Sequence, residues 1–148
     1  MDWSLIWVGS LAGGCAGAIM SFLSHVAPRF GAGNFIEDSG LETHAFGKPI
    51  SRRESHFLGI LVHLLLSIGF GFVFALGVEW GWIPGYQYLP MLGYCVILAL
   101  FTGCVIMPIE GYGVFGLKHD SWFMVDAILT NFLWGHLFLV LMRLWLAV

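Results

Sequence analysis

The chain has 148 residues, of which 59% are hydrophobic and only 10% charged, and its mean hydropathy is +0.87. A soluble domain carries roughly 25% charged residues, so this composition excludes an ordinary water-soluble protein. The net charge of −3 is too small to indicate a nucleic-acid partner or an acidic one. The length suits one domain, and we expect a single all-α unit over residues 1–148, an integral membrane four-helix bundle.

The first apolar stretch, Trp3 to Ser24, predicts a transmembrane helix with a row of small residues. No basic region precedes it and no clear cleavage site follows it, so we interpret it as a retained helix rather than a signal peptide. The row repeats every four residues and consists of Gly9, Gly13, Gly17 and Ser21. Small residues at this spacing let another helix approach closely, whether that helix belongs to the same chain or to a separate subunit.

A long polar loop, residues 25–55, follows the first helix. It contains four of the six Lys and Arg residues of the protein. Basic residues favour the cytoplasmic side of a membrane, and acidic residues count little in that preference. We therefore place this loop in the cytoplasm.

The second span is predicted over residues 57–78, a stretch without Asp, Glu, Lys or Arg. A helix needs about 20 mostly apolar residues to cross the hydrocarbon core, and this stretch meets that length. Within it Ser67, Gly71 and Ala75 form another small-residue row, which suits the row on the first helix. Residues 79–88 contain no Lys or Arg but several Trp and Tyr residues, as in an aromatic belt, and we place them outside.

Two more spans are predicted over residues 89–109 and 123–146. The glycine-rich turn between them contains Lys118, which agrees with the cytoplasmic side. The last span carries Asp126 in its first turn and Arg143 in its last, and both placements suit the helix dipole. Four spans put both termini on the outer side of what we expect to be a bacterial inner (cytoplasmic) membrane.

Two histidines, His63 and His136, lie inside predicted spans, where ionisable residues are costly and are functional candidates by default. Haem and a chlorophyll-type pigment are the cofactors to consider. A rise of 1.5 Å per residue puts His63 about 10 Å and His136 about 20 Å below the inner face, so they are poorly matched as two ligands of one haem. A pigment needs only one axial histidine. The structural alternative is a hydrogen bond from each histidine to a neighbouring helix.

A second polar group is predicted at the cytoplasmic ends of the helices. It consists of His25, His56, Glu110 and His119. Imidazole and carboxylate side chains at a similar depth can bind a metal ion or relay protons. Polar residues that are simply hydrated at the membrane surface give the same pattern.

A transporter or proton-conducting protein would use a related set, Glu110, Asp126, His56 and His136. Many transporters contain two similar halves, and this chain shows no convincing internal repeat. The three cysteines all fall inside predicted spans without zinc spacing, which indicates small apolar fillers. No phosphate loop, nucleophile elbow or HExxH pattern is present, and we do not expect an enzyme.

The second half of the chain contains a span that ends in a Met-Pro-x-x-Gly turn at Met107, Pro108 and Gly111, and a final span with a Gly-His element at Gly135 and His136. This arrangement resembles the YagU-like small multi-pass bacterial membrane proteins. The resemblance implies a multi-helix inner-membrane protein and adds little about chemistry. The long glycine-rich first loop departs from that pattern.

Our first hypothesis for function is a non-catalytic integral membrane subunit or accessory protein of a larger membrane complex. Such a protein would pack through its small-residue helix faces against other membrane subunits and the lipid bilayer. The alternatives are a haem- or pigment-binding protein that uses its transmembrane histidines, and a small transporter or proton-conducting protein. A visible absorption band would separate the second hypothesis from the first.

Overall fold

The computed structural model describes residues 1–26, 44–45, 48–49, 52–109, 112–118 and 122–146. Four helical stretches in it are long and apolar enough to cross a membrane, which confirms the four predicted helices. These stretches are Trp3–Ser24, Phe57–Glu79, Tyr88–Ile109 and Phe123–Leu146. The helices that contain them are α1 (Trp3–Val26), α2 (Arg52–Glu79), α3 (Tyr88–Phe101) with its continuation, and α5 (Phe123–Leu146).

Short elements occupy the connections. Two-residue strands β1 (His44–Ala45) and β2 (Lys48–Pro49) pair antiparallel in the connection between α1 and α2, and the fold itself is all-helical, as expected. Helix α3 continues as a π-helical turn, η3 (Thr102–Ile106), and then as α4 (Met107–Ile109). A 3-10 turn, η4 (Val114–Gly116), precedes α5. Because α1 extends to Val26 and α2 begins at Arg52, the connection predicted over residues 25–55 is shorter than expected.

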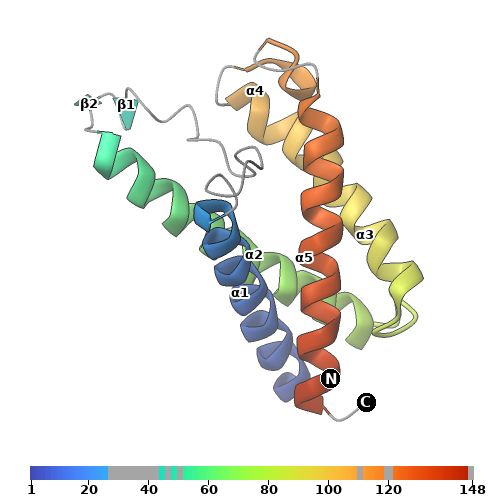
Figure 1. Ribbon diagram of the computed structural model, residues 1–148. Helices are drawn as coiled ribbons and strands as arrows, with labels where there is room; N and C mark the ends of the chain where they lie inside the picture. Colours follow the sequence, from blue (N-terminus) through green and yellow to red (C-terminus); the bar gives the residue numbers. More distant parts are fainter. Residues whose placement is uncertain (27–43, 46–47, 50–51, 110–111, 119–121, 147–148) are drawn as a thin grey trace.

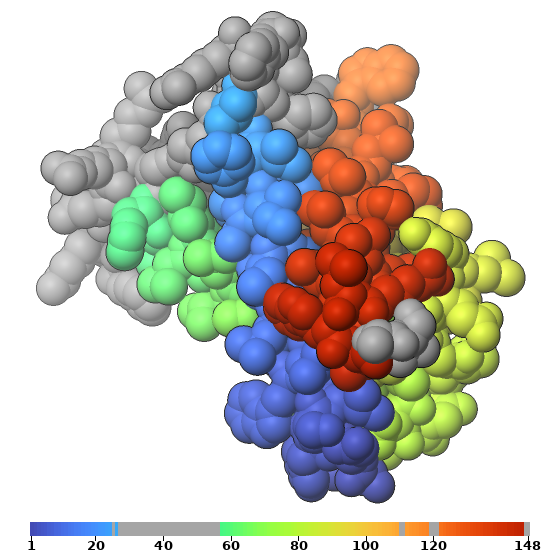
Figure 2. All heavy atoms as spheres, turned by 60° about the horizontal axis from the view of Figure 1, so that its bottom comes forward, coloured from blue at the N-terminus to red at the C-terminus, as the bar shows by residue number. Residues whose placement is uncertain are grey.

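Helix α5 stands between α1 and α3, and α2 crosses behind them at a steep angle (Figure 1). The most extensive contact between described elements joins α1 and α2. The first residues of α1 and the last residues of α5 lie at the same end of the bundle (Figure 1). Seen from that end, α1, α5 and α3 lie side by side in blue, red and yellow (Figure 2).

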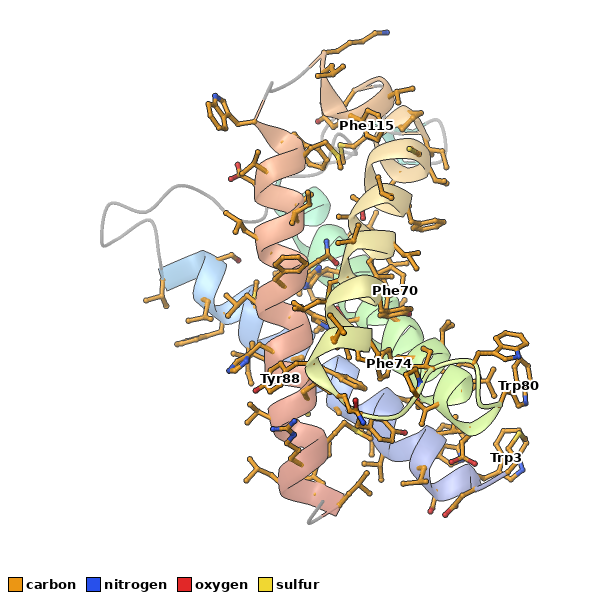
Figure 3. The ribbon with its side chains drawn as sticks, turned by 90° about the vertical axis from the view of Figure 1, so that its right-hand side faces the viewer. Trp3, Phe70, Phe74, Trp80, Tyr88 and Phe115 are labelled. Carbon is orange, nitrogen blue, oxygen red and sulfur yellow. The ribbon has the colours of Figure 1, made fainter. Side chains whose placement is uncertain are left out.

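Large aromatic side chains connect α2 with α3 and α5. The ring of Phe74 lies 5.2 Å from that of Tyr94 and 5.5 Å from that of Phe138, measured between centroids. Phe70 meets Trp134 edge-on at 6.4 Å. Figure 3 shows Phe70 and Phe74 reaching from α2 toward the other helices. Aromatic rings therefore fill the wider spaces, whereas small residues line the close contact between α1 and α2.

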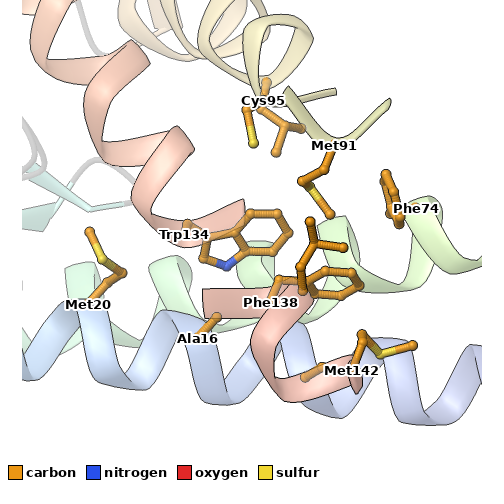
Figure 4. Close-up of a cluster of buried hydrophobic side chains, with 11 residues drawn as sticks. Ala16, Met20, Phe74, Met91, Cys95, Trp134, Phe138 and Met142 are labelled. Carbon is orange, nitrogen blue, oxygen red and sulfur yellow. The ribbon is translucent and has the colours of Figure 1, made fainter. Parts of the chain in front are cut away.

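The hydrophobic core gathers where the second half of α5 meets α1 and the first half of α3 (Figure 4). Trp134 is central to it, because its ring stacks on Phe138 at 5.5 Å and its indole N–H donates to the Gly13 carbonyl at 3.3 Å. The fully buried core residues include Ala12, Ala16, Phe74, Cys95, Phe138 and Leu139.

The outer surface of the bundle is strongly apolar. Trp7 on α1 is 67% exposed and Leu89 on α3 is 81% exposed, and large apolar side chains are exposed on every one of the four long helices. Soluble monomers rarely expose contiguous apolar patches of this extent. A surface of this kind suits contact with lipid. Lipid tails offer no hydrogen-bond partners, and a helix satisfies its own backbone N–H and C=O groups internally.

Candidate functional site

The two predicted small-residue rows lie against each other at the crossing of α1 and α2. A Cβ atom added to Gly9 would lie 2.5 Å from the Cβ of Ala75. One added to Gly71 would lie 3.0 Å from the Cα of Gly13, so the two backbones touch at this level. No side chain fits between the helices there, which explains why both positions are glycine.

The same contact continues toward the far ends of the rows. A Cβ on Gly17 would lie 2.6 Å from the Cβ of Ser67, and both Ser21 and Ser67 are buried. The row on α1 is therefore occupied by α2 of the same chain. A partner subunit would have to use a different surface.

His63 also belongs to this crossing. It stands four residues before Ser67 on α2, and its Nε2 atom lies 3.8 Å from the position of a Cβ on Gly17. That nitrogen is buried and has no hydrogen-bond partner among the described residues. Since α1 covers this nitrogen, Nε2 of His63 is not open to a cofactor in this arrangement.

His136 has a different environment, on the outer side of α5. Its side chain is exposed, and its ring stacks on the ring of Tyr88, with centroids 5.8 Å apart and planes at 26°. The guanidinium carbon of Arg143 lies 4.8 Å from the centroid of the same tyrosine ring. His136 and Arg143 are two helical turns apart, about 10 Å, and Tyr88 bridges that interval.

His136 lies beside the start of α3, because Tyr88 is the first residue of that helix. His63, on α2, is packed against Gly17 of α1. The two histidines therefore contact different helices, and the structure does not bring them together.

An outward-facing stripe on α5, called here the α5 outer stripe, surrounds His136. Leu129, Leu133, His136, Val140 and Arg143 follow one another at alternating spacings of four and three residues. Leu129 is 59% exposed and Leu133 is 42% exposed. A repeat averaging 3.5 residues is the spacing by which one helix packs along another.

A second feature lies at the end of the bundle that carries the chain termini. Tyr86, Met142, Arg143 and Leu146 line a surface hollow of about 240 Å³. The Tyr86 hydroxyl is buried and has no hydrogen-bond partner among the described residues. Burial, and then the charges of Glu79 and Asp2, raise the pKa of Tyr86 to about 12.

Asp2 and Glu79 join the first turn of α1 to the last turn of α2. The backbone N–H of Asp2 donates to a Glu79 carboxylate oxygen at 2.6 Å. The Asp2 carboxylate accepts from the side chain and the backbone of Ser4, and these bonds lower its pKa. This end of the molecule therefore holds two carboxylates beside Tyr86 and one guanidinium at the hollow.

The predicted metal group falls largely outside the described structure. Glu110 and His119 are outside the described residues, and His25 and His56 are described only as parts of helices α1 and α2. Among the residues that the structure describes, no three His, Cys, Asp or Glu side chains gather as a metal site. Of the transport set, Asp126 and His136 are both exposed on α5 but ten residues apart, about 15 Å along the helix.

The π-helical turn η3 was not predicted from the sequence. It ends at Ile106, two residues before Pro108, which has no N–H and whose ring would clash with the carbonyl four residues earlier in a regular α-helix. Widening the preceding turn lets the helix continue through the proline, as local π adjustments do in spanning helices. Pro108 was the signal available in the sequence.

Phe115 packs beside this turn in an unusual conformation. Its φ of 58° is the one positive value for a non-glycine residue in the described structure. A Cβ on Gly103 of η3 would lie 2.7 Å from the Phe115 ring and 2.7 Å from the sulfur of Met124. Gly103 therefore leaves the space that this ring occupies, at the end of the bundle opposite Trp3 (Figure 3).

The cysteines divide between interior and surface. Cys95 is fully buried and packs on Gly135, where an added Cβ would lie 2.5 Å from its sulfur. Cys15 and Cys104 are exposed, and all three are free thiols.

Comparison of the chain with protein-family models, with curated proteins and with solved structures gave no significant match.

Proposed function

We propose that this chain is a non-catalytic accessory subunit of a larger membrane complex, and that it meets a partner helix along the Leu129–Val140 part of the α5 outer stripe. The observation that carries the proposal is the outward-facing imidazole of His136. Ionisable residues within spans almost always face the bundle interior, a water-filled cavity or a polar partner. His136 instead lies on an exposed, otherwise mainly apolar stripe.

Within the part of the chain that the structure describes, the ring contact of His136 is a stacking contact, and the polarity of its nitrogens is left unsatisfied. Tyr88 stacks on one face of the imidazole ring, and a stacking contact does not replace the hydrogen bonds of the ring nitrogens. A polar side chain on a neighbouring helix would supply such a bond, which is worth about 0.6 to 2 kcal/mol between spanning helices. The flanking leucines and their 3.5-residue spacing suit side-by-side packing with that helix.

The orientation that we propose follows from the basic residues. Four of the six Lys and Arg residues lie in residues 25–55, and Lys118 lies in the connection on the same side of the bundle. The rule that basic loops stay inside then assigns both connections to the cytoplasm and both termini to the outer side of a bacterial inner membrane. Lipid and other membrane subunits are the partners of such a protein, and nucleic acid is not.

The test compares complexes isolated from the native membrane in mild detergent. Co-eluting chains are identified by mass spectrometry for the wild type, His136→Phe, which keeps a ring but removes its nitrogens, and His136→Gln, which keeps a polar group. Ile97→Phe, which adds a ring at an exposed position on α3, is the matched control. We expect stoichiometric partners to be lost only in His136→Phe.

A second candidate function is the ligation of a chlorophyll-type pigment by His136. The observation that favours it is that the His136 side chain is exposed, whereas the Nε2 atom of His63 is buried against α1. One axial histidine suffices for such a pigment. A visible absorption band that co-purifies with the chain and disappears in His136→Phe would support this function. A colourless wild-type protein without partners would contradict both proposals.

A further inference from the structure

The hollow at the end of the bundle has the composition of a site for an amphipathic molecule. Its lining combines the guanidinium-bearing Arg143 with the apolar side chains of Met142 and Leu146 and with Tyr86. Its volume of about 240 Å³ is below the ~300–1,000 Å³ of sites that enclose a whole small molecule. It is therefore large enough for a headgroup whose remainder stays outside.

Arg143 is available for an anion at this place. It is exposed, and no carboxylate among the described residues forms an ion pair with it. Its guanidinium lies over the ring of Tyr88 at 4.8 Å, a cation–π contact that fixes the planar group. A guanidinium held in this way presents N–H donors that match two phosphate oxygens at once.

The position of the hollow points to a lipid rather than to a soluble anion. Arg143 is in the last turn of α5, and Tyr86 precedes α3 in the connection that also contains the exposed residues Trp80 and Trp82. Trp and Tyr residues collect at the headgroup level of a membrane. Met142 and Leu146 form the apolar part of its wall, beside which acyl chains would lie.

The carboxylates of Glu79 and Asp2, which lie near Tyr86, indicate the type of headgroup. Glu79 and Asp2 lie close enough to Tyr86 to affect its hydroxyl electrostatically, and both belong to the joined ends of α1 and α2. These two carboxylates, partly offset by the N-terminal ammonium group near Asp2, disfavour a negative group of the ligand on the Tyr86 side of the hollow. They favour a ligand that carries an ammonium group beside its phosphate.

We propose that this hollow binds the headgroup of a zwitterionic phospholipid, with the phosphate on Arg143 and the ammonium toward Glu79 and Asp2. Tyr88 is the positioning residue that holds the guanidinium, and Met142 and Leu146 contact the glycerol end of the lipid. The bound lipid would belong to the leaflet on the side of the chain termini. The site does not depend on a partner subunit.

The test is native mass spectrometry of the full chain in detergent, titrated separately with phosphatidylethanolamine, phosphatidylglycerol and inorganic phosphate. Phosphatidylglycerol has the same phosphate but no ammonium group. The variants are Arg143→Gln, Arg143→Lys and Glu79→Gln. Lys118→Gln is the matched control, because it removes an exposed cation at the opposite end of the bundle.

We expect phosphatidylethanolamine to be retained over phosphatidylglycerol and its affinity to fall about tenfold in Arg143→Gln, as for loss of one charge-assisted contact. Arg143→Lys should retain part of the affinity, Lys118→Gln all of it, and Glu79→Gln should reduce the preference between the lipids. Equal binding in Arg143→Gln, or a preference for phosphatidylglycerol, would overturn the proposal. Inorganic phosphate that binds and displaces the lipid would identify a free-anion site instead.

Discussion

At the scale of single residues, Tyr88 shows how one side chain can define a surface. It is the first residue of α3, yet its ring meets two residues of α5, His136 on one side and Arg143 on the other. A tyrosine at the end of a span is expected to act as a membrane-interface anchor. Here it also contacts His136 and Arg143. Among the described residues in the second half of α5, these are the two that can carry a positive charge.

Tyr86 leads to a prediction about alkaline pH. Its pKa is raised to about 12 by burial and by the charges of Glu79 and Asp2, whereas tyrosine in an unfolded chain has a pKa of about 10. Between these values the folded state binds more protons than the unfolded state. The contribution of Tyr86 to stability is therefore complete below about pH 10 and is lost as the pH rises toward about 12.

The measurement is the free energy of unfolding in detergent at a series of pH values, for the wild type and for Tyr86→Phe. The phenylalanine variant cannot ionise at this position, so its stability should decline less steeply over the alkaline range. Equal slopes in the two proteins would show that the Tyr86 hydroxyl is as well hydrated in the folded state as in the unfolded one.

Phe115 allows backbone strain to be separated from ring packing. Its φ of 58° and ψ of 20° lie in the left-handed region, which costs an L-residue roughly 1–2 kcal/mol. Phe115→Ala and Phe115→Gly both remove the ring, but only glycine adopts this backbone without strain. We expect the glycine variant to be about 1 kcal/mol more stable than the alanine variant in thermal unfolding. An alanine variant of equal or greater stability would mean that this turn relaxes when the ring is absent.

At the scale of elements, the crossing of α1 and α2 depends on the absence of side chains on both helices. Two glycines on α2, two residues apart, make a matched pair for testing this. A Cβ on Gly71 would lie 3.0 Å from the Cα of Gly13, whereas a Cβ on Gly69 would have no neighbour within 4 Å. The two positions have the same residue and the same helix but differ in packing.

Gly71→Ala should therefore destabilise the protein by about 1–3 kcal/mol, as expected when a group is forced into a closely packed contact. Gly69→Ala should leave stability unchanged or raise it slightly, because alanine favours a helix more than glycine does. Apparent melting temperatures in one detergent provide the comparison. Similar destabilisation by both substitutions would indicate that helix flexibility, rather than close packing, explains the glycines.

At the scale of the whole molecule, the four long helices could be predicted from the sequence because each is a long apolar stretch with few charges. The predicted second and third spans, 57–78 and 89–109, differ by one residue from the stretches 57–79 and 88–109 in the structure. The length and position of a spanning helix can be read from the composition of its own stretch of sequence. The environments of the polar residues depend instead on how the helices cross, and composition does not report crossing angles.

His63 and His136 illustrate that limit. Both were selected because they lie within apolar stretches, but one is packed against Gly17 and the other faces outward beside Tyr88. The hollow at Arg143 could not be predicted either, because its lining residues come from segments more than 50 positions apart.

Orientation in the membrane is the property of the whole molecule that can be tested most directly. Gln87, between α2 and α3, and Lys118, between η4 and α5, are exposed residues in connections at opposite ends of the bundle. The excess of Lys and Arg in residues 25–55 predicts that this connection, and Lys118 with it, lies in the cytoplasm. After replacement of the three native cysteines by serine, Gln87→Cys should react with a membrane-impermeant maleimide on spheroplasts. Lys118→Cys should react only in inverted vesicles. The reverse pattern would place the termini and the hollow at Arg143 on the cytoplasmic side, and labelling of both cysteines in one preparation would contradict a membrane-spanning bundle.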